Sequence, residues 1–286
     1  ETPDEVRDRV LRAARFIARY QVQPEPALVD AVKGMASRLE IISAERIRDE
    51  LDKLVTVAHP TAGLWFAIDT GLCDHFLPEL PSMRLEQDPI HRHKDVLTHT
   101  LAVMENIRPQ HEMPEGSPAF DFRRTRLAAL FHDVGKPRTR GYQKGKGVTF
   151  HHHDAVGARM TRKRLTALRY SHDDIEAITE LVALHLRFHT YRMGWTDSAV
   201  RRYVRDAGPL LDRLNELTRC DCTTRNRNRA RDLARRMDEL EARIAALRER
   251  EELDAIRPPL DGRQVMEFLG MSPGPLVGEA LDHLLE

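Results

Sequence analysis

Histidines gather in one part of this 286-residue chain, since eleven of the fourteen lie between His91 and His189. Imidazoles together with carboxylates are the usual ligands of divalent metals of intermediate softness, and a protein-bound metal can turn water into a nucleophile at neutral pH. The clustering therefore predicts a metal centre with hydrolytic chemistry in the middle of the chain.

His132 and Asp133 are distinguished from the other polar residues by their context. They follow the apolar run 127–131, so a buried helix delivers both side chains at its C-terminal end, where burial is costly unless something pairs with them. His99 lies in a second apolar helical stretch, and Asp221 lies beside the apolar positions of a third. A bound metal would provide the partner that buried His132 and Asp133 need.

This arrangement resembles the HD superfamily of metal-dependent phosphohydrolases. The resemblance rests on His99-Thr100-Leu101, on His132-Asp133 followed by Gly135-Lys136, and on a late aspartate. It implies that His99, His132, Asp133 and Asp221 bind one divalent metal, either Mg, Mn, Ni, Co, Fe or Zn. The chemistry that it implies is hydrolysis of a phosphate ester, such as an RNA 2′,3′-cyclic phosphate or a terminal phosphate.

Some members of that superfamily with further histidines hold two metals. His153 and His185 are the candidates for a second site, and a hydrogen-bonded core histidine is the alternative for each. Lys136 and Arg187 are then expected to neutralise non-bridging phosphate oxygens, the alternative being a solvated cation beside a loop. The prediction is one or two metals per chain.

Apolar residues at three- and four-residue spacing dominate the elements that must position these side chains, so the predicted fold is all-α. Helices are expected at 4–20, 26–38, 43–57, 61–71, 93–108, 121–133, 154–169, 172–188, 196–206, 208–221, 226–252, 261–269 and 275–285. The segments 110–118 and 135–147 are expected to be loops, the second of them basic and punctuated by glycine.

Composition excludes several classes of protein. Lysine and arginine number 45 against 45 acidic residues, so a uniformly basic nucleic-acid binder is excluded while local patches are not. A charged fraction of 31% and the absence of a long apolar run exclude a membrane span and a secretory leader. Three cysteines without a pairing framework fit a reducing compartment, and a cytoplasmic location without membrane partners is predicted.

The flanks extend the resemblance to essentially the whole chain. Residues 11–16, 42–51 and 72–80 are similar to the neck and body of bacterial CCA-adding tRNA nucleotidyltransferases, and 150–153, 184–191 and 195–202 to their actinobacterial-type members with an HD domain. The implied domains are a helical neck and body at 1–85, an HD domain at 86–225 and a helical tail with tRNA contact at 226–286.

The family's catalytic head is expected to be missing. Its glycine pair and its Asp-x-Asp carboxylates do not occur in the sequence, so nucleotide addition is not expected from this chain alone. Because the chain also starts without Met, it is expected to be the rear portion of a larger enzyme. Glu5 and Arg9 match the family's nucleotide-selecting motif, with Arg12 close by, although Val6 replaces an aspartate there.

The segment 219–236 carries seven arginines against two aspartates. The family resemblance favours contact with the tRNA backbone, whereas a solvated helix face is the alternative. The residues expected to bind RNA are Arg219, Arg225, Arg227, Arg229 and Arg231.

The predicted function is that of a portion of a CCA tRNA nucleotidyltransferase, acting on the 3′ end of tRNA or other RNA in processing or repair. Its HD domain is expected to hydrolyse phosphate esters of RNA or nucleotides with a bound divalent metal. Two alternatives remain open: a non-catalytic RNA-binding module with an idle HD site, and a stand-alone HD phosphohydrolase acting on free nucleotides.

Overall fold

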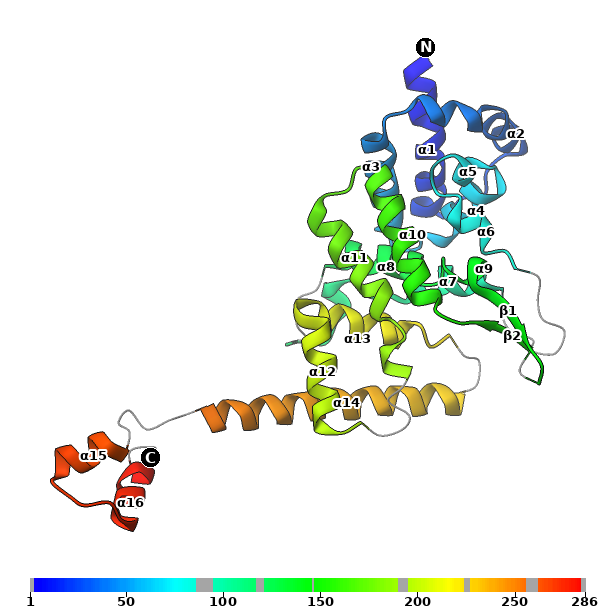
Figure 1. The fold of residues 1–286 in the computed structure, drawn as a ribbon. Coiled ribbons are helices and arrows are strands. Elements are labelled where there is room, and N and C mark those ends of the chain that lie inside the picture. Colours follow the sequence, from blue (N-terminus) through cyan, green and yellow to red (C-terminus); the bar gives the residue numbers. More distant parts are fainter. Residues whose placement is uncertain are drawn as a thin grey trace.

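The computed structural model describes the chain except residues 1–2, 86–94, 117–120, 146, 190–194, 224–226, 256–261 and 284–286. At 3–9, 227, 229, 252–255, 281 and 282 it describes the backbone alone. The described part consists of helices and one two-stranded hairpin, which confirms the predicted all-α class (Figure 1).

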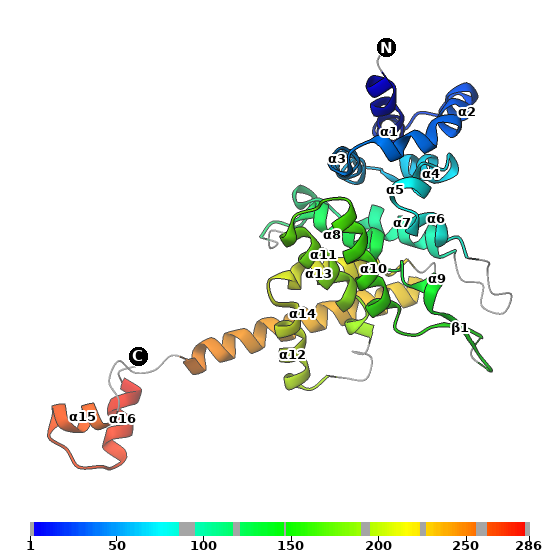
Figure 2. The ribbon, with the colours of Figure 1, turned by 45° about the horizontal axis from the view of Figure 1, so that its top comes forward.

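A group of N-terminal helices forms the upper part of Figure 1. It comprises α1 (Pro3–Tyr20), α2 (Pro26–Met35), a 3₁₀ segment (Ala36–Ile41), α3 (Ala44–Val55), α4 (Thr61–Asp69), α5 (Leu72–Phe76) and α6 (Glu79–Ser82). Helix α1 packs against α3 and α4, as the turned view of Figure 2 also shows. Gly63 permits this close approach, because a Cβ atom there would collide with the carbonyl oxygen of Ala14 on α1.

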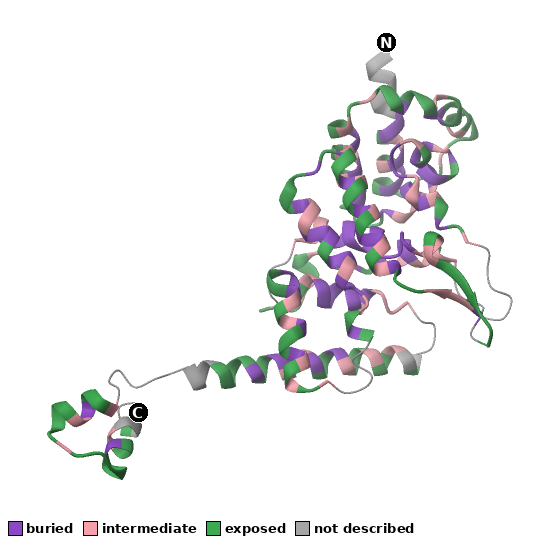
Figure 3. Ribbon diagram, viewed as in Figure 1, coloured by how far each residue is buried: buried purple, intermediate pink, exposed green. Residues whose placement is uncertain are grey.

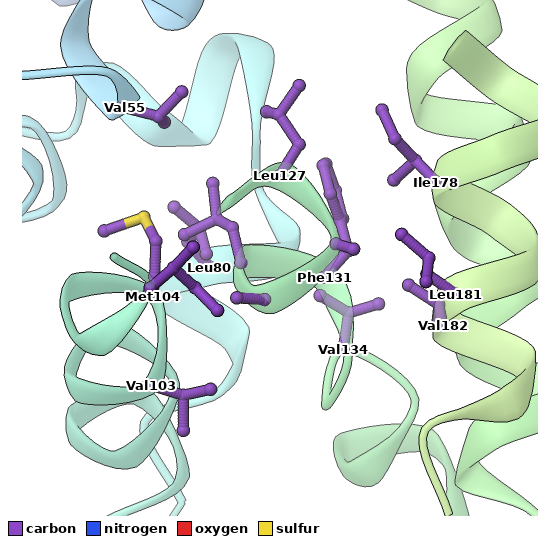
Figure 4. Packing of buried hydrophobic residues seen from close by; sticks show 14 of the residues in the cluster. Val55, Leu80, Val103, Met104, Leu127, Phe131, Val134, Ile178, Leu181 and Val182 are labelled. Carbon is purple, nitrogen blue, oxygen red and sulfur yellow. The ribbon is translucent and has the colours of Figure 1, made fainter. Parts of the chain in front are cut away.

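The middle of the chain is organised around α8 (Phe122–Phe131), a helix that is buried from Thr125 to its end. It packs against α7 (Val96–Asn106), α11 (His172–Leu184) and α13 (Leu211–Cys220). In Figure 4, Phe131 and Val134 face apolar side chains of α11 while Met104 of α7 lies on the other side. Burial on all sides explains why 127–131 is apolar without interruption.

Further elements of the middle of the chain lie outside these four helices. They are a 3₁₀ turn (Gln110–Glu112), α9 (Lys136–Thr139), β1 (Arg140–Gln143), β2 (Gly147–Phe150), α10 (His153–Ala167), α12 (Asp197–Ala207) and a second 3₁₀ turn (Gly208–Leu210). The predicted loop at 135–147 was wrong in part, because it contains α9, β1 and the start of the antiparallel strand β2. Gly145, with φ +83°, lies between the two strands in a backbone conformation that glycine adopts without strain.

The long helix α14 (Arg227–Ala255) packs against α12 and α13 and passes below α13 in Figure 1. It contributes a buried stripe to the core, and most of its remaining surface is exposed in Figure 3; the stripe consists of Met237, Leu240, Ile244 and Leu247. Helices α15 (Gly262–Leu269) and α16 (Pro275–His283) pack against each other. None of the described helices combines the length and the hydropathy needed to cross a bilayer.

The N-terminal helices and the middle of the chain share one hydrophobic core. Buried Arg126 of α8 donates from Nη1 to the carbonyl oxygen of Val55 at 2.7 Å, at the end of α3. Asp52 of α3 accepts from Arg123 at 2.9 Å and from the hydroxyl of Tyr170 at 2.6 Å. These contacts fix α3 against the helices that carry the histidines.

Candidate metal centre

The six predicted metal ligands all lie at or near helix ends around α8. His132 and Asp133 follow α8 directly, and His99 lies in the first turn of α7. His153 is the first residue of α10, while His185 and Asp221 follow the last residues of α11 and α13. Five segments far apart in sequence therefore meet at one place in the core.

Four of these side chains form a first group. Nε2 of His99 lies 2.9 Å from Oδ1 of Asp221 and 3.7 Å from Oδ2 of Asp133. Nε2 of His132 lies 3.3 Å from the same oxygen of Asp133 and 3.6 Å from Oδ1 of Asp221. Ligand atoms of His99, His132 and Asp133 all lie within 4.8 Å of one another, a separation that suits coordination of a single ion.

Asp133 also belongs to a second group. Its other oxygen, Oδ1, lies 3.3 Å from Nε2 of His153, and Nε2 of His153 lies 3.3 Å from Nε2 of His185. Asp133, His153 and His185 are all buried, and their ligand atoms again lie within 4.8 Å of one another. The two oxygens of one carboxylate thus face two different sets of imidazoles.

Backbone carbonyls fix the orientation of three of the imidazoles. Nδ1 of His132, His153 and His185 lies 2.6–2.7 Å from the carbonyl oxygen three residues earlier. Because a carbonyl only accepts, Nδ1 carries a proton in each ring, and Nε2 is the atom that faces the cluster. This second contact is the usual way in which proteins orient a metal-binding imidazole.

The electrostatics of the centre favour a positive charge beside the carboxylates. Burial disfavours a charged His132, but the carboxylates of Asp133 and Asp221 outweigh burial and raise the pKa of this residue to about 10. The pKa values of Asp133 and Asp221 lie well below their usual range, since neighbouring imidazoles outweigh burial. Burial and the nearby His132 lower the pKa of His185 to about 4, so that its ring is neutral at pH 7.

The donor set fits a divalent metal on two observations. Nε2 of His132 is buried and has no hydrogen-bond partner of acceptable geometry in the described part of the chain. The Nε2 atoms of His153 and His185 lie 3.3 Å apart, so that a shared proton or a metal ion is needed to join two ring nitrogens that otherwise act as acceptors. A mixed set of imidazole and carboxylate donors suits divalent transition metals, including Mn²⁺, better than it suits Mg²⁺.

The two predicted phosphate-binding cations lie in different surroundings. Nζ of Lys136 donates to Oδ2 of Asp133 at 2.6 Å, and its side chain is 21% exposed. Arg187 is half exposed and pairs with Asp206 of α12 at 3.4 Å. Lys136 therefore lies at the cluster itself, whereas Arg187 is engaged by a neighbouring helix.

Two residues that the sequence analysis did not propose lie at the centre. Nε2 of His189 lies 3.7 Å from Oδ2 of Asp221. The hydroxyl of Thr223 lies 2.8 Å from Nδ1 of His99 and takes the place that a carbonyl has for the other imidazoles. Only their spacing from predicted ligands could have indicated these two residues in the sequence. His189 lies four residues after His185, and Thr223 lies two residues after Asp221.

The structure describes the side chains of only three of the residues predicted to bind RNA or nucleotide. Arg219 bridges α13 and α14 by pairing with Asp238 at 2.7 Å and Glu241 at 2.6 Å. Arg231 on α14 and Arg12 on α1 are exposed. The remaining predicted side chains lie outside the described residues: those of Glu5, Arg9, Arg225, Arg227 and Arg229.

Comparison with protein families bears on the cluster directly. The model of the HD domain matches residues 96–250, which include the six candidate ligands and more than half of the chain. The chain belongs to the HD domain family. A second model, described as the probable RNA and SrmB-binding site of polymerase A, matches residues 22–83 of this HD-family chain.

Relatives of the HD-family chain extend the comparison. It is 35% identical to the A-adding tRNA nucleotidyltransferase of Deinococcus radiodurans over 97% of its own length and 63% of that protein. It is 34% identical to the CC-adding tRNA nucleotidyltransferase of Thermus thermophilus over 99% of its length and 58% of that protein. These matches confirm the resemblance to tRNA nucleotidyltransferases that carry an HD domain, and the chain spans less than two thirds of either relative.

A solved structure described as a CCA-adding enzyme in complex with CTP has a similar fold. The TM-score is 0.51 at 14% sequence identity, over 99% of this chain and 55% of the other. At that identity the likeness concerns the fold alone.

Proposed function

We propose that the histidine and aspartate cluster is a metal-dependent phosphohydrolase centre that acts on phosphate esters at RNA 3′ ends. The observation that carries the proposal is the pair of ligand groups that share Asp133 in the core of an HD-family domain. A carboxylate shared between two sets of imidazoles is an arrangement suited to two divalent ions.

The roles of the ligands follow from their geometry. His99, His132, Asp133 and Asp221 would hold the first ion, and Asp133, His153 and His185 would hold the second. A bound divalent metal supplies Lewis acidity, which activates water and polarises a phosphoryl group. The carbonyl anchors on Nδ1 of the three buried imidazoles keep Nε2 directed into the cluster, so little side-chain freedom is lost when an ion binds.

The cations beside the centre position the substrate. Lys136 lies within hydrogen-bond distance of Asp133 and is partly exposed, so its ammonium group is available to a phosphate oxygen at the cluster. Arg187 serves the same purpose if a substrate phosphate competes with Asp206, the partner that lies 3.4 Å away. Partly exposed His189 lies beside Asp221.

The wider context that we propose is tRNA 3′-end processing or repair in the cytoplasm, with tRNA or another RNA 3′ end as partner. The named relatives and the RNA-binding family model at 22–83 support it. In this scheme 1–85 forms the neck and body, 86–225 the HD domain and 226–286 the tail. Glu5, Arg9 and Arg12 would contact nucleotide, and the exposed arginines near the start of α14 would contact the tRNA backbone.

Hydrolysis assays test the proposal. The full chain, loaded in turn with each divalent metal, is offered bis-p-nitrophenyl phosphate and an oligoribonucleotide that ends in a 2′,3′-cyclic phosphate. We expect turnover with at least one metal and its loss in His132→Gln, while His172→Ala, a histidine that is 84% exposed on the surface, retains it. Metal binding without turnover of either ester would refute the proposal and favour the non-catalytic module.

A further inference from the structure

We propose that the β1–β2 hairpin is an arm that binds single-stranded RNA and leads its phosphate ester into the metal centre. The inference rests on the proposed function for the class of its partner. The hairpin extends away from the helices beside α9 (Figures 1 and 2). The function derived above makes no use of it.

The arm is connected to the metal centre at both of its ends. Before it, Asp133 is followed by Lys136 at the start of α9, and α9 continues directly into β1. After it, β2 ends at Phe150, whose carbonyl oxygen accepts the Nδ1 proton of His153 at 2.7 Å. A ligand seated on the hairpin is therefore adjacent to the metal-binding side chains.

The charge of the segment is of one sign. Residues 134–153 contain five lysines and arginines and no aspartate or glutamate. In the part of the chain that the structure describes, exposed Arg138, Arg140 and Lys144 form no ion pair, in contrast to Arg219, which is held by two carboxylates. Cations without internal partners that project into solvent complement a polyanion.

The two faces of the hairpin differ in chemistry. Arg140 pairs with Phe150 and Tyr142 with Val148 across the strands, so these side chains share one face. Tyr142 is 71% exposed. The other face carries the glycine, glutamine and threonine of the alternate positions. Only the first face interleaves cations with aromatic rings.

This first face continues to the cluster. Nζ of Lys136 lies 5.8 Å from the ring centroid of Phe150, and the same atom donates to Asp133. Tyr142, Arg140, Phe150 and Lys136 thus form a path from the exposed arm to a candidate metal ligand. Proteins bind single strands by stacking bases on aromatic rings and tracking the backbone with cations, which is the pattern of this face.

Binding to a short fluorescent single-stranded oligoribonucleotide, followed by anisotropy at several salt concentrations, tests the arm. Each phosphate contact on a single strand contributes about 0.7 to the slope of log K against log salt. We therefore expect the triple variant Arg138→Ala, Arg140→Ala, Lys144→Ala to bind more weakly and to reduce that slope by about two. The control variant Arg159→Ala, Lys163→Ala, Arg202→Ala removes the same charge from exposed positions of α10 and α12 and should retain the slope.

A second pair of variants separates stacking from charge. Tyr142→Ala should weaken RNA binding by roughly 5- to 150-fold, the usual effect of removing one stacked ring. Gln143→Ala on the opposite face of the same strand should have no effect. All variants are compared by circular dichroism and thermal unfolding, so that a folding defect is recognised.

The outcomes are distinct. Equal weakening by the hairpin and the control triple variants would overturn the proposal, as would unchanged binding by Tyr142→Ala. Binding to phosphatidylserine vesicles that is lost in the hairpin variant, with RNA binding unchanged, would overturn it in favour of membrane contact. Because the measurement is binding and not turnover, RNA binding by the arm in a chain without hydrolysis would refute the proposed function and leave the RNA-binding role of the arm standing.

Discussion

Asp133 provides the sharpest test of the centre, because its two oxygens face different imidazoles. Oδ2 lies toward His99 and His132, whereas Oδ1 lies 3.3 Å from Nε2 of His153. Asp133→Asn removes the charge that both groups share and should abolish binding of both ions. His185→Ala leaves the first group complete and reduces the second to two ligands, so it should abolish binding of one ion only.

Each bound ion should also stabilise the folded chain against unfolding. At a free metal concentration of about 100 times Kd, one bound ion stabilises the folded chain by roughly 2.7 kcal/mol. Each kcal/mol corresponds to about 2–4 °C in Tm for a domain of this size, so one ion contributes roughly 5–10 °C. The metal-dependent rise in Tm should be largest in the wild-type chain, smaller in His185→Ala and absent in Asp133→Asn.

The assay counts ions per chain by mass spectrometry after dialysis and measures Tm with and without metal. Wild type and the surface variant His172→Ala should hold two ions, His185→Ala one and Asp133→Asn none. A single ion in the wild type would refute the two-site reasoning. Two ions in His185→Ala, or an unaltered ion in Asp133→Asn, would show that Asp133 is not shared.

Three further predictions concern the surroundings of the centre. Thr223→Val should lower metal affinity about 10- to 100-fold because His99 loses its anchor, and Thr223→Ser should restore it in a titration calorimeter. Gly135→Ala should cost about 1–3 kcal/mol and displace His153, since a Cβ atom would collide with the His153 carbonyl, whereas Gly34→Ala, with open space around it, should not destabilise. Asp174 accepts from Arg124 and Arg123, which outweigh burial and lower its pKa, so its stabilisation is present above its ordinary pKa and is lost as pH falls through the lowered value. Urea unfolding should show Asp174→Asn about 1–3 kcal/mol less stable near pH 7, with the difference shrinking below about pH 4 and a constant difference contradicting the linkage.

Helical periodicity was a sufficient guide to the elements that carry the centre. The apolar run before His132 can be satisfied only by a helix buried on all sides, and such a helix places its C-terminal residues among its neighbours. The structure brings His99, Asp221, His153 and His185 to the same point, and their role as ligands stays a prediction.

The hairpin could not be read from the sequence for a physical reason. Strands are recognised by runs of alternating apolar and polar residues, but β1 and β2 have only four residues each. In β1 the single aromatic residue, Tyr142, is too little to establish an alternation. The ion pairs of Arg219 could not be predicted from the sequence either. Its partners Asp238 and Glu241 lie about twenty residues further along the chain and reach it only because α14 packs against α13. Contacts of this kind depend on packing and not on local pattern.

The anchor on His99 sets a lower limit on the length of chain that can carry this centre. His99 comes from the first turn of α7, while its carboxylate neighbour Asp221 and its anchor Thr223 lie beyond the end of α13. The six candidate ligands and Thr223 make seven groups, and a fragment truncated before 221 keeps five of them. It loses Asp221 and Thr223, the two groups that contact His99 from the end of α13. Residues 96–223 are therefore the shortest contiguous stretch that contains α7 and all of these groups, and ion retention by successively trimmed chains would test that limit without any assay of activity.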